Sequence, residues 1–149
     1  MIDCNSCHFM TVKEKDQKEP HICRFLNRRI PHQAPRECPR TLGLTLHNLK
    51  TERPDREYDV YIGRPGPLGN SFSITKTQTR EIVCQKYEKW FHEQLYNPQS
   101  RVSMKVAWLL SAYERYGRLR FFCWCVPNQC HGETIIKFLL TALEGSGKL

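Results

Sequence analysis

The sequence has no run of about 18 consecutive apolar residues, the length that a membrane-spanning helix requires. Its first residues, 1–7, also lack the basic start and the apolar stretch of a secretory signal peptide. We therefore expect a cytoplasmic protein with no membrane partner. Internal repeats and low-complexity tracts are absent as well. At 149 residues the chain fits one ordinary domain, or a domain of about 100 residues with a small appendage.

Acidic residues are scarce relative to basic ones. Lysine and arginine number 23 against 15 aspartates and glutamates, which gives a formal net charge of +8. Such a charge favours polyanionic partners such as nucleic acid, nucleotides or other phosphates. The eight cysteines, in a chain without a secretion signal, indicate a reducing compartment. There, cysteines serve as metal ligands, core residues or reactive thiols more often than as disulfides.

Residues 1–40 form a separate segment that holds few apolar residues and four cysteines, Cys4, Cys7, Cys23 and Cys38. So short a segment cannot bury enough apolar surface to fold alone, and a metal held by four thiolates would supply the missing stability. We therefore predict a Cys-rich metal-binding module with these ligands. Zinc is the first candidate and a [4Fe–4S] cluster the alternative. One of three histidines could replace a thiolate: His8, His21 or His32. A flexible arm with unliganded thiols would also explain the composition.

The same segment carries a cluster of arginines. Between residues 21 and 40 the only acid is Glu37, against Arg24, Arg28, Arg29, Arg36 and Arg40. Together they would form a basic face suited to phosphate contacts and hence to nucleic acid. A solvated surface explains them equally well.

The remaining residues, 41–149, are predicted to form an α/β domain. Alternating apolar positions indicate strands at residues 42–49 and 58–62, which could pair as a hairpin. The second strand runs directly into a loop rich in glycine and proline, residues 63–72. This glycine-rich loop matches neither a Walker loop nor a dinucleotide fingerprint, so a ligand site and a tight structural turn are equally consistent with it.

Four residues of the glycine-rich loop are candidate ligand contacts. Gly63 and Gly69 would let backbone N–H groups approach a ligand closely. Arg64 could grip a phosphate or a carboxylate through two hydrogen bonds, and Asn70 could contact a base or sugar edge.

The helix that follows this loop is predicted to begin after Thr79, which can cap it, and to run to about Leu95. Its apolar face would consist of Ile82, Val83, Tyr87, Trp90, Phe91 and Leu95. Arg80 and Glu81 lie in its first turn, and they would be near the glycine-rich loop if that loop folds back. Their alternative role is that of a solvated pair, with Glu81 favoured by the helix dipole.

A second helix is predicted to start at Asn97-Pro98 and to end at Gly117, with proline at its first position. An apolar stretch, residues 119–126, then indicates a buried strand. A last helix follows, starting near Glu133 and running to about Leu143. Between this strand and this helix lies a turn that contains Cys130 and His131, here called the Cys-His turn. Ligands of open α/β sheets bind at such positions, because loops and helix N-termini converge there.

Four groups in this region invite three interpretations. Cys123 and Cys125 would face the same side of the strand, while Cys130 and His131 lie at the helix N-terminus. The four could bind a second metal, or Cys130 or Cys125 could be a nucleophile with His131 as its base. The interpretation we favour makes the cysteines small core residues, with His131 and nearby backbone N–H groups binding a ligand.

Three long stretches stand out together: YDVYIGRPGPLGNSF at residues 58–72, TRE at 79–81 and CWCVPNQCHG at 123–132. In this order they resemble a family of phage and bacterial proteins known as domain of unknown function 4326. The resemblance covers about residues 42–143, and Ser71 stands where that family often has proline. It implies a compact α/β domain and carries no established activity. For a phage-encoded protein, it implies location in the host cytoplasm.

We therefore predict a small Rossmann-like α/β domain at residues 41–149, in which about three helices cover a partly parallel sheet. The glycine-rich loop and the Cys-His turn would form one pocket for a nucleotide or a nucleotide-derived small molecule. The predicted ligand contacts are Gly63, Arg64, Gly69, Asn70, Arg80 and Cys125. If the ligand is hydrolysed or transferred, the catalytic candidates are Glu81, Cys130 and His131.

Two alternative functions remain open from the sequence. One is a protein that sequesters a signalling nucleotide without chemistry, as in phage–host conflict. The other is a zinc-stabilised adapter that binds nucleic acid or a host protein through the basic module at residues 1–40.

Overall fold

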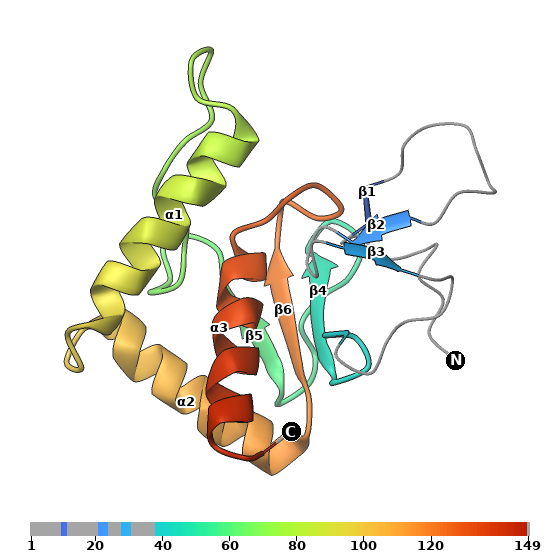
Figure 1. Cartoon of the computed structure of the whole chain (residues 1–149). Coiled ribbons are helices and arrows are strands. Elements are labelled where there is room, and N and C mark those ends of the chain that lie inside the picture. Colours follow the sequence, from blue (N-terminus) through green and yellow to red (C-terminus); the bar gives the residue numbers. More distant parts are fainter. Residues whose placement is uncertain (1–9, 12–20, 24–27, 31–37, 149) are drawn as a thin grey trace.

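The computed structural model describes residues 10–11, 21–23, 28–30 and 38–148. The first three ranges are the strands β1 (Met10–Thr11), β2 (His21–Cys23) and β3 (Arg28–Ile30). They pair in the order β1-β2-β3 as an antiparallel sheet (Figure 1).

The main sheet consists of β4 (Leu44–Asn48), β5 (Asp59–Tyr61) and β6 (Leu119–Cys123), in the order β4-β6-β5 with both pairs parallel (Figure 1). The hairpin predicted between the first two of these strands is therefore wrong, because β6 lies between them and pairs with each. The mostly buried β6 suits the central position, since a central parallel strand is paired along both edges and covered by other elements.

α1 (Arg80–Leu95) has the predicted bounds. Thr79 caps it, and the Thr79 side chain accepts a hydrogen bond from the Ile82 N–H. The predicted apolar face is wrong at Ile82, which is 37% exposed. The inward positions are instead taken by residues whose spacing follows one stripe of the helix: Val83, Cys84, Tyr87 and Phe91.

α2 (Arg101–Tyr116) begins later than predicted from Asn97-Pro98. Ser100 provides the cap, because its Oγ accepts a hydrogen bond from the Ser103 N–H at 3.0 Å. The helix ends as predicted at Gly117, which has the left-handed φ of 68°.

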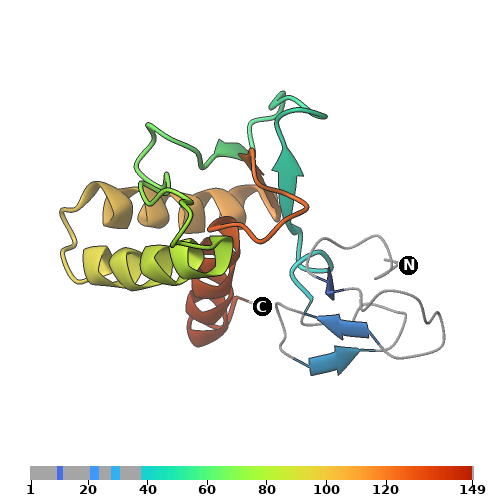
Figure 2. The same cartoon turned by 90° about the horizontal axis from the view of Figure 1, so that it is seen from above.

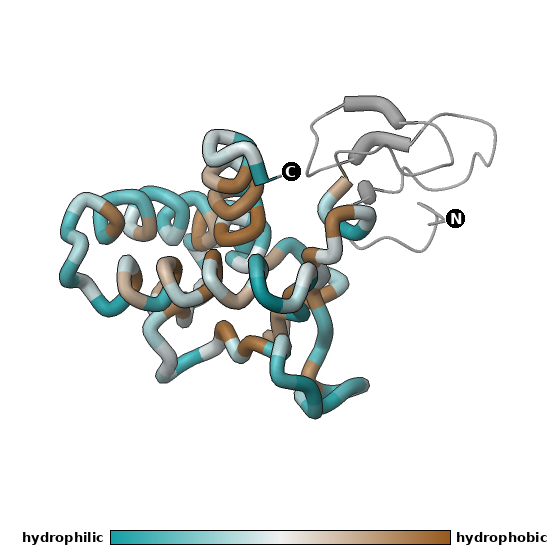
Figure 3. The backbone as a smooth tube through the Cα atoms, turned by 90° about the horizontal axis from the view of Figure 1, so that it is seen from below, coloured by the Kyte–Doolittle hydropathy of each residue, from teal (hydrophilic) through white to brown (hydrophobic). Residues whose placement is uncertain are grey.

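α3 (Gly132–Gly145) starts directly after the Cys-His turn and is apolar along most of its length (Figure 3). The helices gather on one side of the main sheet, where they form a single core with alternate strand residues (Figure 2). This core includes Leu44, Leu46, Val60, Leu119, Phe121, Tyr87, Phe91, Val106, Leu109, Ile135, Ile136 and Leu139. The predicted α/β class, with three helices on a parallel sheet, is confirmed. In the described part of the chain, no helix has the length and apolarity to cross a membrane.

Candidate functional site

Two loops leave the same edge of the main sheet, because β5 and β6 are parallel neighbours. Residues 63–72 follow β5, and residues 124–131 follow β6. A cavity of about 360 Å³ opens between them. Its lining includes six of the predicted site residues, Gly63, Arg64, Asn70, Arg80, Cys125 and His131, together with Phe72, Ser73, Ile74, Val83, Cys123 and Trp124.

His131 connects the two loops. It is buried at the start of α3, and its Nε2 lies 2.7 Å from the carbonyl oxygen of Ile62, directly after β5. Nε2 must carry a proton to donate to this carbonyl, so in the neutral ring Nδ1 bears the lone pair. Nδ1 lies 3.7 Å from Cys130 Sγ, and the Tyr87 ring packs edge-on against the imidazole at 4.8 Å. The imidazole is therefore fixed in orientation, with Nδ1 beside the thiols.

The glycine-rich loop folds into two consecutive turns. The Gly66 N–H donates to the Gly63 carbonyl at 3.0 Å, and the Gly69 N–H donates to the Gly66 carbonyl at 2.9 Å. A Cβ on Gly69 would lie 2.9 Å from the Gly63 oxygen and from the Arg64 nitrogen, so a larger residue would push the loop apart. Gly69 thus has a structural role in the turn, while Arg64 and Asn70 line the cavity.

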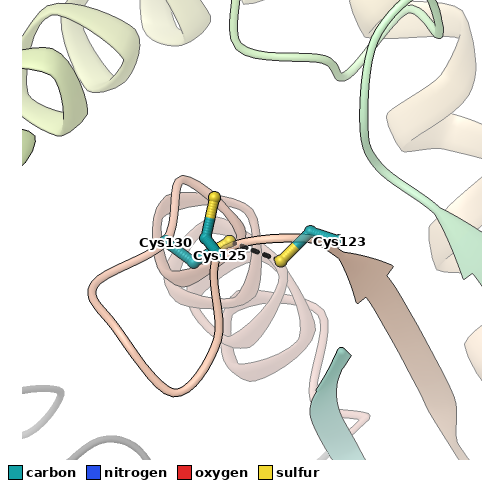
Figure 4. Close-up of side chains that lie close together, drawn as sticks. All are labelled: Cys123, Cys125 and Cys130. Atoms are coloured by element: carbon teal, nitrogen blue, oxygen red, sulfur yellow. Dashed lines mark hydrogen bonds between the residues drawn. The ribbon is translucent and has the colours of Figure 1, made fainter. Parts of the chain in front are cut away.

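Three thiols converge at the base of the Cys-His turn. The sulfurs of Cys123, Cys125 and Cys130 lie within 4.8 Å of one another, and those of Cys123 and Cys130 are 3.0 Å apart (Figure 4). Cys123 is the last residue of β6, whereas Cys125 lies in the loop beyond it. The prediction that both cysteines face one side of a strand is therefore wrong. The chain turns after Cys123, and this turn places the Cys125 sulfur near those of Cys123 and Cys130. Three sulfurs in this arrangement can hold a metal ion.

The cluster favours a thiolate on Cys125. Hydrogen bonds from the Cys123 and Cys130 thiols hold the pKa of the Cys125 thiol well below its usual range. The pKa of Cys130 is well above its usual range, because its sulfur interacts with Cys123 and Cys125 and is buried. Cys125 is also the least buried of the three.

Two arginines bring positive charge to the cavity. Arg64 comes from the glycine-rich loop, and Arg80 is the first residue of α1, with Nη1 3.5 Å from the Gln129 carbonyl oxygen. Within the described ranges no carboxylate pairs with either guanidinium, and no aspartate or glutamate lines the cavity. Among the described residues, the lining therefore combines two arginines with no aspartate or glutamate, beside the Cys125 sulfur.

Three predicted site residues do not line the cavity. Glu81 is exposed on α1, Cys130 is buried in the thiol cluster, and Gly69 is buried within its turn. Conversely, Phe72 and Trp124 line the cavity, although neither was predicted as a site residue from the sequence. The buried strand predicted over residues 119–126 concealed Trp124, which is 56% exposed because β6 ends one residue before it. The nearby proline, Pro127, was the signal for an earlier strand end.

The predicted N-terminal metal ligands lie partly outside the described residues. Cys4 and Cys7 lie outside the described residues, and Cys23 is described only as a backbone position of β2. Cys38 is buried and is the first residue of the described range 38–148. The metal-binding module at residues 1–40 and its choice between zinc and an iron–sulfur cluster therefore stay predictions.

Comparison with known proteins gives one match. The family model described as Domain of unknown function (DUF4326) matches residues 47–141, which includes both loops of the cavity. No curated protein and no solved structure matches the chain.

Proposed function

The chain belongs to the family Domain of unknown function 4326, and because this description names no activity, we propose a function from the cavity itself. The cavity binds a nucleotide or a nucleotide-derived small molecule, and it holds this ligand without turning it over. In a phage-encoded protein, such binding would withdraw a signalling nucleotide from the host.

The observation that carries this proposal is the pair of arginines without acidic partners. A guanidinium presents its donors in a planar fork that matches two oxygens of a phosphate. Arg64 and Arg80 reach the same cavity from different elements, and neither is neutralised by a carboxylate of the described chain. Such a site favours an anion over a neutral or apolar ligand.

Aromatic side chains beside the arginines support a ligand with a flat ring. Trp124 and Phe72 both line the cavity, and Trp124 is 56% exposed. An exposed tryptophan at a cavity mouth offers a stacking surface, which contributes about 1–3 kcal/mol per base in nucleic-acid complexes. Asn70 lines the cavity, and its Oδ1 accepts a hydrogen bond from the Phe72 N–H at 2.9 Å. Its amide N–H₂ would be the donor for a base or sugar.

The volume and the chemistry of the lining agree with binding rather than turnover. About 360 Å³ falls within the range of small-molecule sites, roughly 300–1,000 Å³. Hydrolysis or glycosyl transfer needs a positioned acid or base, and Glu81, the carboxylate predicted for this task, is exposed on α1 and outside the described lining. Of the other two candidates, Cys130 is buried in the thiol cluster and outside the described lining, and His131 already uses Nε2 for the Ile62 carbonyl.

The test is titration calorimetry with a panel of purified mono- and dinucleotides, followed by mass spectrometry of each ligand after incubation. We expect saturable binding of at least one nucleotide, recovered with unchanged mass. Arg64→Ala and Arg80→Ala should each weaken binding about ten-fold or more, the effect of losing one charge-assisted contact. Arg53→Ala removes an exposed arginine outside the cavity and is the matched control. Equal affinities for all three variants would refute the binding site, and a changed ligand mass would refute the absence of turnover.

A further inference from the structure

We infer that Cys123, Cys125, Cys130 and Nδ1 of His131 are the four ligands of a single zinc-class ion at the base of the cavity. This site is independent of the nucleotide proposal, and it is distinct from the metal predicted for residues 1–40.

The backbone brings the four donors together from one short segment. Cys123 ends β6, Cys125 lies in the following loop, and Cys130 comes shortly before α3 (Figure 4). His131 immediately precedes that helix. The thiol sulfurs lie within 4.8 Å of one another. In a tetrahedral site with metal–sulfur bonds of about 2.3 Å, two sulfurs are separated by about 3.8 Å. The sulfurs of Cys123 and Cys130, which are 3.0 Å apart, would have to separate to share one ion, and rotation of their side chains provides this movement.

His131 supplies the fourth ligand. Nδ1 lies 3.7 Å from Cys130 Sγ, and a nitrogen and a sulfur that share a tetrahedral zinc ion are separated by about 3.6 Å. Its other nitrogen, Nε2, is 2.7 Å from the Ile62 carbonyl oxygen. Histidines that bind metals almost always donate their second N–H to a carbonyl or carboxylate, which leaves the coordinating nitrogen unprotonated. The buried ring thus directs its unprotonated nitrogen, Nδ1, toward the Cys130 sulfur, as a histidine that coordinates a metal would.

The surroundings stabilise the charge of such a site. Three thiolates, a neutral imidazole and a divalent ion carry one net negative charge. The N-terminus of α3 lies against the cluster, and the Gly132 N–H is 3.4 Å from Cys130 Sγ. This N–H donor and the positive end of the helix dipole offset the negative charge of the site.

The donor set also selects the metal. Soft thiolates combined with imidazole suit zinc, whereas calcium and magnesium prefer oxygen ligands. In a [4Fe–4S] cluster each thiolate binds a different iron at a different corner of the cluster, so the cysteine sulfurs lie far apart. The sulfurs of Cys123, Cys125 and Cys130 are too close together for such a cluster. Because all four positions are filled by protein, the ion has a structural role: it fixes the floor of the cavity and occupies the nitrogen with which His131 could act as a base.

The experiment must separate this ion from any metal bound by the N-terminal cysteines. We would purify the full chain carrying Cys4→Ser and Cys7→Ser, and measure its metal content by mass spectrometry. We expect about one zinc per chain. Adding His131→Ala or Cys125→Ser should lower retention strongly after dialysis against a chelator. His131→Cys should restore it, which a purely packing role of the imidazole would not explain. Cys84→Ser, which changes a buried thiol outside the cluster, is the control.

Cobalt substitution provides a readout that does not depend on the stability of the variants. The Cys4→Ser, Cys7→Ser chain loaded with Co²⁺ should show the intense visible bands of a tetrahedral ion and the near-ultraviolet thiolate-to-cobalt charge transfer. Binding of zinc should remove these bands and protect the three thiols from alkylation. The inference is overturned if the cobalt spectrum lacks thiolate charge transfer, or if Cys123 and Cys130 are recovered as a disulfide from protein purified under reducing conditions.

Discussion

Arginines occupy two contrasting environments around one sheet. On its face away from the helices, Arg120 of β6 contacts three acids: its Nε lies 2.7 Å from Asp59, its Nη2 lies 2.9 Å from Asp55, and its Nη1 contacts Glu52. At the edge where β5 and β6 end, Arg64 and Arg80 have no acidic partner among the described residues.

This difference distinguishes an arginine that stabilises the fold, Arg120, from two arginines whose guanidinium groups are accessible to a ligand, Arg64 and Arg80. The Asp59 side chain is only 1% exposed. Burial raises its pKa, but hydrogen bonds from Arg120 and from the backbone N–H groups of Asp55 and Arg56 outweigh this effect and leave the pKa below its ordinary value. Arg120 is thus paired within the protein, whereas the two cavity arginines have no acidic partner among the described residues.

The largest expected effect on stability comes from removing the Arg120 guanidinium and its contacts with three acids. Arg120→Met leaves the Asp59 carboxylate buried without its cation, so the free energy of unfolding should fall by about 3 kcal/mol or more. Arg64→Met should change it by less than about 0.5 kcal/mol, since Arg64 is exposed and forms no ion pair with another described residue. Urea denaturation followed by circular dichroism measures both. Equal losses of stability in the two variants would contradict the distinction drawn between these arginines.

A smaller effect concerns acid stability. Hydrogen bonds from His47 and Arg120 outweigh the opposing effect of burial and hold the pKa of Glu52 below its ordinary value, as the network also does for Asp59. The stability that these groups contribute is present above their unfolded pKa, and it is lost as pH falls through the lower folded values. The urea midpoint should therefore decrease between about pH 5 and pH 3. In Glu52→Gln this decrease should be shallower, and parallel curves for the two proteins would exclude Glu52 as a contributor.

The meeting of the two loops could be predicted from the sequence because it depends on local signals. A strand followed by glycines and prolines, and a second strand followed by a helix start, each define a loop at a strand's carboxyl end. Parallel pairing then brings Gly63 and His131 to one cavity. The cap at Thr79 and the stop at Gly117 are equally local, and both were predicted correctly.

The features that were not predicted depend on tertiary contacts. The pairing order could not be read locally, since β4 and β5 are close in sequence but β6, far along the chain, lies between them. Two of the three acids around Arg120, Glu52 and Asp55, lie in a segment that has the composition of a loop, and only the fold brings them to β6. The exposure of Trp124 was hidden because an apolar run does not reveal where its strand ends.

The most direct test of the central claim compares a nucleotide with its phosphate-free nucleoside. We would take the best nucleotide from the panel and measure both affinities for the wild-type chain and for the double variant Arg64→Ala, Arg80→Ala. If the two arginines bind phosphate, the wild type should prefer the nucleotide by about 10- to 100-fold, which corresponds to about 1.5–3 kcal/mol for charged hydrogen bonds. The double variant should lose most of this preference and retain its affinity for the nucleoside. An undiminished preference in the double variant would show that the phosphate binds elsewhere and would contradict the account.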